Sequence, residues 1–188
     1  MLNLEEQKEL FLTTARETIH REGVTDLLNW LQKADFFTAP ASTRYHGAYA
    51  GGLCEHSLDV WNYAQKLAPL SPVKLSPESL CIASLFHDVC KVNFYTVKIR
   101  GRSSIFTVEE QLPFGGHGSK SVYILSKYLK DIRDEEAIAI NCHMGFSRAV
   151  DSSVSLGESF HYSPLAWLIH VADEAATFLL DRVKPEEY

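Results

Sequence analysis

The run ASLFHDVCKV, residues 83–92, places an adjacent histidine and aspartate, His87 and Asp88, inside an almost wholly apolar segment. A charged carboxylate is costly to bury unless a cation or several hydrogen bonds compensate it. Ser76 followed by Pro77 is a typical helix start, so we expect one largely buried helix to carry the run. By itself the dipeptide fits two interpretations: a pair of metal ligands, or an aspartate that caps backbone amides beside a core histidine.

Around this run, apolar residues recur at helical spacing through most of the chain, which predicts a mainly α-helical protein. The exception lies on either side of the turn-like Arg100-Gly101-Arg102, where NFYTVKI and SSIFTVEE predict a two-stranded hairpin near residues 93–110. We expect this hairpin to stand off the helical body. The other expected helices cover about residues 4–20, 24–34, 53–67, 117–129, 134–146 and 164–183.

Length, charge and composition limit the possible domain organisation and functions of the chain. A chain of 188 residues, 46% hydrophobic and 22% charged, is expected to form one domain spanning 1–188, with N-terminal helices at 1–35 before a core at about 39–182. The net charge of −6 argues against stable binding to duplex nucleic acid. No apolar stretch approaches the roughly 20 residues of a membrane span, so we expect a cytoplasmic protein. The four cysteines form no CxxC pair, which favours reduced, buried thiols.

Two further segments carry possible metal ligands on other expected helices. GGLCEHSLDV, residues 51–60, contains His56, and LIHVADEAA, residues 168–176, contains Asp173. A helical bundle builds an internal metal site from side chains on facing helices, and imidazole together with carboxylate suits divalent first-row metals. A site of this kind would compensate the charge of Asp88, so both interpretations of the dipeptide stay open at this point.

On these residues the sequence resembles the HD-domain superfamily, whose pattern is a histidine, an adjacent His-Asp pair and a late aspartate, each on its own helix. The resemblance runs from about residue 39 to 182 and implies an all-α, HD-domain helical bundle that acts as a metal-dependent phosphohydrolase. The stretch 39–60, APASTRYHGAYAGGLCEHSLDV, is especially similar to bacterial HD proteins related to 3′-to-5′ exoribonucleases. Those exoribonucleases also carry an OB domain, for which these 188 residues have no room, so exonuclease activity itself is not implied.

The resemblance implies a ligand set for one or two divalent ions, drawn from Mn, Fe, Zn, Ni or Mg. Two further histidines, in PFGGHGSKS and AINCHMGF, fall where two-metal members of the superfamily bind a second ion, with Asp88 as the bridge. Taken alone, the first of these histidines fits a helix-capping residue equally well, and the second fits a core histidine. The complete expected ligand set is His56, His87, Asp88, His117, His143 and Asp173.

Two residues are expected to take part in the reaction. Asp88 positions the attacking hydroxide, and Lys91, one helical turn after His87, stabilises developing negative charge. His170, three residues before Asp173, is interpreted as a packed core or supporting residue. Candidates for contacting the substrate are His46, Arg44 and Lys120.

The expected substrate is a phosphorylated small molecule, and a nucleotide or a short oligonucleotide is preferred. Aromatic residues near the hairpin, Phe94, Tyr95, Phe106 and Phe114, can stack on a base, although packing of the hairpin onto the bundle explains them equally well. Two alternatives belong to other classes: a di-iron oxygenase of the HD type, and a catalytically silent HD module that senses a nucleotide. Redox-active iron would distinguish the first, and nucleotide binding without turnover would distinguish the second.

Overall fold

The structure is a computed structural model that describes residues 2–43, 46–100, 103–108, 116–145 and 156–180. Within these residues the regular secondary structure is helical apart from one two-stranded sheet, so the predicted all-α class is confirmed. None of the described helices is both long enough and apolar enough to cross a membrane.

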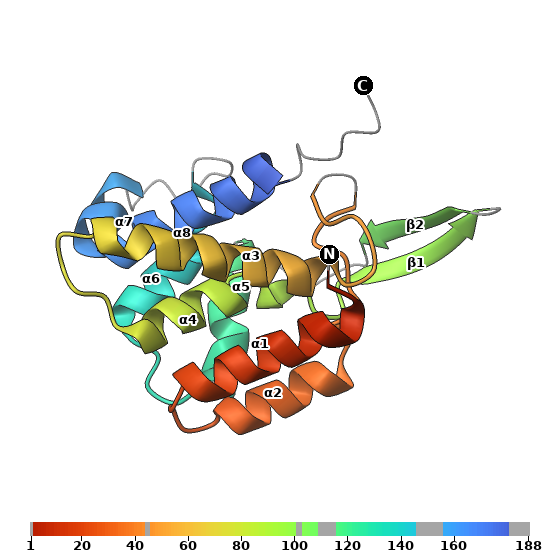
Figure 1. The fold of residues 1–188 in the computed structure, drawn as a ribbon, viewed down its shortest axis with the longest axis horizontal. Coiled ribbons are helices and arrows are strands. Elements are labelled where there is room, and N and C mark those ends of the chain that lie inside the picture. Colours follow the sequence, from red (N-terminus) through yellow and green to blue (C-terminus); the bar gives the residue numbers. More distant parts are fainter. Residues whose placement is uncertain (1, 44–45, 101–102, 109–115, 146–155, 181–188) are drawn as a thin grey trace.

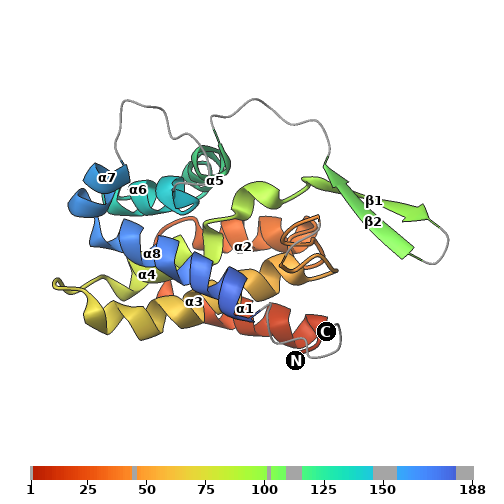
Figure 2. The same ribbon diagram turned by 90° about the horizontal axis from the view of Figure 1, so that it is seen from above.

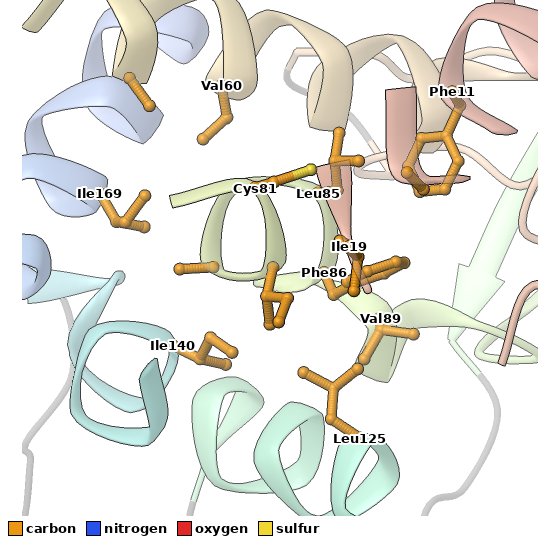
Figure 3. Close-up of a cluster of buried hydrophobic side chains, with 14 of the residues drawn as sticks. Phe11, Ile19, Val60, Cys81, Leu85, Phe86, Val89, Leu125, Ile140 and Ile169 are labelled. Carbon is orange, nitrogen blue, oxygen red and sulfur yellow. The ribbon is translucent and has the colours of Figure 1, made fainter. Parts of the chain in front are cut away.

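Helix α4 (Pro77–Phe86) is the centre of the fold. Every residue from Ser79 to Phe86 is buried, because the helix is apolar almost all round. Ser76 caps its first turn by accepting a hydrogen bond from the Ser79 N–H at 3.3 Å, and Pro77 occupies the first helical position, as the sequence predicts. Figure 3 shows α4 ringed by side chains from the surrounding helices, including Val60, Leu125, Ile140 and Ile169.

The helices around α4 form two sides of the bundle (Figure 1). On one side lies α1 (Leu4–Thr18), which begins at an Asn3–Glu6 capping box and packs against α2 (Val24–Lys33) and α4. On another side, α3 (Gly52–Leu67) contacts both α4 and α8 (Pro164–Ala175). Phe11 of α1 packs edge-on against Phe86, the last residue of α4, with ring centroids 5.7 Å apart.

The remaining helical segments close the bundle. Helix α5 (His117–Ser126) packs against α6 (Asp134–Cys142), and α6 packs against α4 and α8. Helix α7 (Leu156–Tyr162), which the periodicity of the sequence did not predict, joins α6 and α8. Short turns of other helix types follow two of the long helices: η1 (Ala68–Leu70) after α3, and the π-helical η4 (Ala176–Leu180) after α8.

The predicted hairpin is present and projects away from the helices (Figure 2). Strand β1 (Tyr95–Arg100) pairs antiparallel with β2 (Ser103–Val108), with Tyr95 opposite Val108 and Arg100 opposite Ser103. The hairpin follows the short 3₁₀ segment η2 (Val89–Lys91), so its base lies close in sequence to His87 and Asp88.

The structure corrects one expectation that bears on function. The helix that carries His87 and Asp88 was expected to continue through Val92, but α4 ends at Phe86 and Asp88 adopts φ −105° and ψ 18°, outside the helical region. In a continuous α-helix, successive side chains point about 100° apart, because 3.6 residues complete one turn. The break after Phe86 therefore lets two adjacent side chains turn toward one centre.

Candidate metal centre

Four polar side chains from three separate parts of the bundle meet in its interior. His56 comes from α3, His87 and Asp88 from the turn after α4, and Asp173 from α8. His56 Nε2 lies 3.0 Å from Asp173 Oδ1 and 3.2 Å from His87 Nε2, and His87 Nε2 lies 3.5 Å from Asp88 Oδ2. All four residues are buried. The structure thus brings together the four residues that the sequence pattern selected, although they span more than a hundred positions.

The orientation of two histidines is fixed by backbone carbonyl groups. His87 Nδ1 lies 2.8 Å from the Ser84 carbonyl oxygen, and His143 Nδ1 lies 2.7 Å from the Ile140 carbonyl oxygen. Because a carbonyl oxygen can only accept a hydrogen bond, each Nδ1 carries the proton. In the neutral ring, Nε2 then presents a lone pair to the centre of the cluster, which is the arrangement that a metal-ligating histidine needs.

His143 provides an independent indication that a cation belongs here. Its Nε2 atom is buried and has no hydrogen-bond partner among the described residues, and it faces Asp88 Oδ1 at 3.6 Å. A lone pair that faces a carboxylate oxygen at this distance is repelled by it, and buried polar atoms are normally paired. A positive ion between the two atoms removes the conflict.

The net negative charge of the cluster also favours binding of a cation. Burial acts to raise the pKa of Asp88, but Lys91 and His87 outweigh it and hold the pKa well below its usual range. The same balance applies to Asp173, whose pKa is lowered chiefly by the hydrogen bond with His56. Both carboxylates are therefore ionised at neutral pH. Lys91 Nζ, 2.6 Å from Asp88 Oδ2, supplies one positive charge against these two, so the donor set fits a divalent ion.

The two carboxylate oxygens of Asp88 point toward different groups of side chains. Oδ2 lies toward His87, at 3.5 Å, and toward Lys91, whereas Oδ1 lies toward His143 and, at 4.0 Å, toward the thiol sulfur of Cys90. Asp88 could therefore offer one oxygen atom to each of the two groups of potential ligands to which it belongs among the described residues.

The grouping of the remaining candidate ligands differs from the sequence interpretation. His143 lies with His87 and Asp173, with their ligand atoms all within 4.8 Å of one another. His117 instead shares a group with Asp88 and Cys90, and its Nδ1 lies 3.5 Å from Cys90 Sγ. Sequence reasoning treated Cys90 only as a buried thiol. The signal that it overlooked is the position of this cysteine, two residues after Asp88.

The expected substrate-contacting residues lie at different distances from the cluster. The His46 ring lies 4.7 Å from the His56 ring, and both of its ring nitrogens are buried with no hydrogen-bond partner in the part of the chain that the structure describes. Burial, aided by nearby positive charge, lowers the pKa of His46 to about 4, so the ring is neutral at pH 7. Lys120 places its ammonium group 5.2 Å from the centre of the Phe94 ring. Arg44 and Phe114 lie outside the described residues.

His170 contacts the backbone of His143, one of the candidate ligands, and not the centre of the cluster. Its Nδ1 donates to the backbone carbonyl of His143 at 2.8 Å, and its ring stacks on Phe160 with centroids 5.5 Å apart. Gly145 lies so close that a Cβ atom there would come within 2.2 Å of the His170 ring. His170 therefore fixes the backbone that carries a candidate ligand, in agreement with its interpretation as a supporting residue.

Comparison with known protein families points in the same direction. The family model of the HD domain matches residues 53–177, which is more than half of the chain and includes His56, Asp173 and the residues between them that form the cluster. No curated protein and no solved structure gives a significant match. The extent of the match shows that the chain belongs to the HD-domain family, whose members are in general metal-dependent hydrolases.

Proposed function

We propose that this protein is a metal-dependent phosphohydrolase that cleaves a phosphoester bond in a nucleotide or a short oligonucleotide. The observation that carries the proposal is the convergence of imidazole and carboxylate groups on one buried centre, where His87 and His143 each turn Nε2 inward and Lys91 lies beside Asp88. The proposed ligands are His56, His87, Asp88, His117, His143 and Asp173.

The protein's own groups organise the reaction. The proposed ligands would hold a divalent ion, which when bound would supply an activated water molecule and polarise a phosphoryl oxygen, so that hydrolysis at neutral pH would need no protein nucleophile. Asp88, whose two oxygens face opposite sides of the cluster, orients the attacking group between them. Although burial opposes it, the ion pair with Asp88 raises the pKa of Lys91, so this ammonium group stays charged and offsets negative charge that develops on the phosphate.

A nucleotide is the proposed substrate class because an aromatic and cationic surface borders the cluster. The Phe94 ring lies 5.9 Å from the His117 ring, and Lys120 lies against the same phenyl group. Aromatic rings bind nucleobases by stacking, and a lysine nearby can bind a phosphate group. The similarity of residues 39–60 to exoribonuclease-related HD proteins supports the same class. The net charge of −6 favours a small phosphorylated substrate over a duplex.

One experiment separates this proposal from the two alternatives. Purified protein, with its metal content measured, is compared with chelator-treated protein against a generic phosphodiester, a generic phosphomonoester, nucleotides and short oligonucleotides. We expect metal-dependent release of product from the phosphodiester or nucleotide substrates. Oxygen consumption by an iron-loaded protein without phosphoester cleavage would favour the oxygenase, and nucleotide binding by the metal-replete protein without turnover would favour the sensing module.

A further inference from the structure

We propose that Cys90 is a metal ligand, so that one ion of this centre is bound by a thiolate together with Asp88 and His117. Such a site takes a thiophilic divalent ion, such as Zn²⁺, Fe²⁺ or Co²⁺, in preference to Mg²⁺, because sulfur is a soft donor and magnesium binds hard oxygen ligands. The inference rests on the proposed metal centre and adds a ligand and an ion preference to it.

The separation of the Cys90 sulfur and the His117 ring nitrogen matches that of two ligands of one metal ion, and Asp88 lies close enough to join them. In zinc sites the metal–sulfur distance is about 2.3 Å and the metal–nitrogen distance is about 2.0–2.1 Å, so tetrahedral coordination separates sulfur and nitrogen by about 3.6 Å. Cys90 Sγ and His117 Nδ1 are 3.5 Å apart. Asp88 Oδ1 lies 4.0 Å from the same sulfur, and the ligand atoms of the three residues all lie within 4.8 Å of one another.

The backbone holds these atoms in place through α5. The Cys90 N–H donates to the buried Ser121 hydroxyl at 3.1 Å, and Ser121 lies one turn after His117 on the same face of the helix. One face of α5 therefore contacts both the backbone and the side chain of Cys90. The first turn of α5 is also fixed against α6, because a Cβ atom at Gly118 would come within 2.5 Å of the Asn141 backbone.

Cys90 differs from the other cysteines in its surroundings. All four thiols are buried and free, but among the described residues only the sulfur of Cys90 belongs to a group of potential metal ligands. Cys81, for comparison, lies in α4 within the hydrophobic core. A metal ion that binds the Cys90 sulfur displaces the thiol proton, which leaves to solvent. His117, at the start of α5, is only partly buried, so this side of the centre has access to solvent.

The test is a titration of the metal-free protein with Co²⁺, followed by absorption spectroscopy. Cobalt that is bound by a thiolate shows a sulfur-to-metal charge-transfer band in the near ultraviolet, whereas cobalt bound only by nitrogen and oxygen does not. We expect the band in the wild-type protein, its loss in Cys90→Ser, and the loss of one tightly bound cobalt equivalent in that variant. Single alanine replacements of Cys54, Cys81 and Cys142 are matched controls that should keep the band.

The possible outcomes distinguish this inference from the proposed function. Cobalt binding by the wild-type protein without the band, or a band that survives in Cys90→Ser, overturns thiolate ligation and leaves the metal centre intact; the sulfur and His117 then share only a hydrogen bond. If no cobalt binds at all, the metal centre itself is refuted. Should Cys90→Ser fail to fold, X-ray absorption of the zinc-loaded wild-type protein decides the question, because a thiolate ligand adds a sulfur scatterer at about 2.3 Å.

Discussion

Two clusters of buried or partly buried charge among the described residues are balanced in opposite ways. The first, around Arg21, joins the starts of α2, α4 and α6 and consists of Arg21, Glu78 and Glu136. The second is the cluster of histidines and aspartates at the other end of α4. Both remove carboxylates from water, which is unfavourable unless the charge is compensated.

The Arg21 cluster is compensated by the chain itself. Arg21 donates to both oxygens of Glu136, at 2.5 and 2.9 Å, and one of those oxygens also accepts the Arg133 N–H at 2.9 Å. Glu78 accepts a hydrogen bond from the His20 N–H at 2.8 Å as well as one from Arg21. Each carboxylate oxygen in this cluster therefore has a donor, and no ion is needed.

The cluster of histidines and aspartates at the candidate metal centre has no such set of donors from the chain. It combines two ionised carboxylates with imidazole lone pairs, and His143 Nε2 has no hydrogen-bond partner among the described residues. A protein that needed this region only for stability could have used a second arginine, as it does around Arg21. This excess of acceptor atoms fits the binding of a cation. Two predictions test that interpretation, and a third tests the burial of His46 beside the cluster, in order of expected effect.

The largest effect is expected at Asp88. Asp88→Asn removes the charge that faces both sides of the centre, so the protein should lose most of its bound metal. Hydrolysis should fall by about 10³-fold, because the ion contributes several kcal/mol of transition-state stabilisation. Metal analysis and initial rates of phosphodiester cleavage measure both effects. Asp26→Asn, at an exposed position on α2, is the control and should change neither. Wild-type metal content in Asp88→Asn would refute the ligand assignment.

A substitution in the Arg21 cluster should lower the stability of the protein without changing its metal content. Glu136→Gln leaves the buried Arg21 without its main counter-charge, and we expect the free energy of unfolding to fall by about 3 kcal/mol. Metal bound per folded molecule should stay unchanged, and added metal should raise the melting temperatures of this variant and of the wild type equally. Asp88→Asn should show the reverse pattern, with little stabilisation by metal. A loss of metal in Glu136→Gln would mean that the two clusters are coupled.

The smallest effect concerns His46 and depends on pH. Its pKa is about 4 in the folded protein against an ordinary value of 6.5, so between these values the unfolded chain binds a proton that the folded chain does not. The stability of the metal-free protein should therefore decrease as the pH falls from 6.5 to 4. Urea unfolding across this range should show a shallower decrease for His46→Gln. The exposed His161 provides the control, since His161→Gln should follow the wild type. Identical pH profiles for His46→Gln and wild type would contradict the burial of this ring.

Much of the fold could be predicted from local sequence signals. Ser76-Pro77 and Ser163-Pro164 mark helix starts through side-chain capping and a fixed proline φ, which are properties of a few neighbouring residues. The hairpin follows from alternating strand residues around Arg100-Gly101-Arg102. Helix α7 escaped prediction because it is short, and a segment of seven residues shows little periodicity.

The sequence by itself also determined which residue types were available for a metal site. Asp88, beside His87, could be selected because a charged carboxylate within an apolar segment needs a compensating partner, whereas His56 and Asp173 were selected through the resemblance to the HD-domain pattern. What the sequence could not determine is the direction of each side chain, because direction depends on where a helix ends.

Only the tertiary structure decided how these groups combine. The end of α4 at Phe86 turns His87 and Asp88 toward one centre, and the packing of α5 against η2 brings the Cys90 sulfur to His117. Both arrangements depend on contacts between segments that are distant in the sequence, and no local pattern encodes such contacts. For that reason the candidate ligands were visible in the sequence, whereas the division of Asp88 between two sides and the place of Cys90 beside it were not.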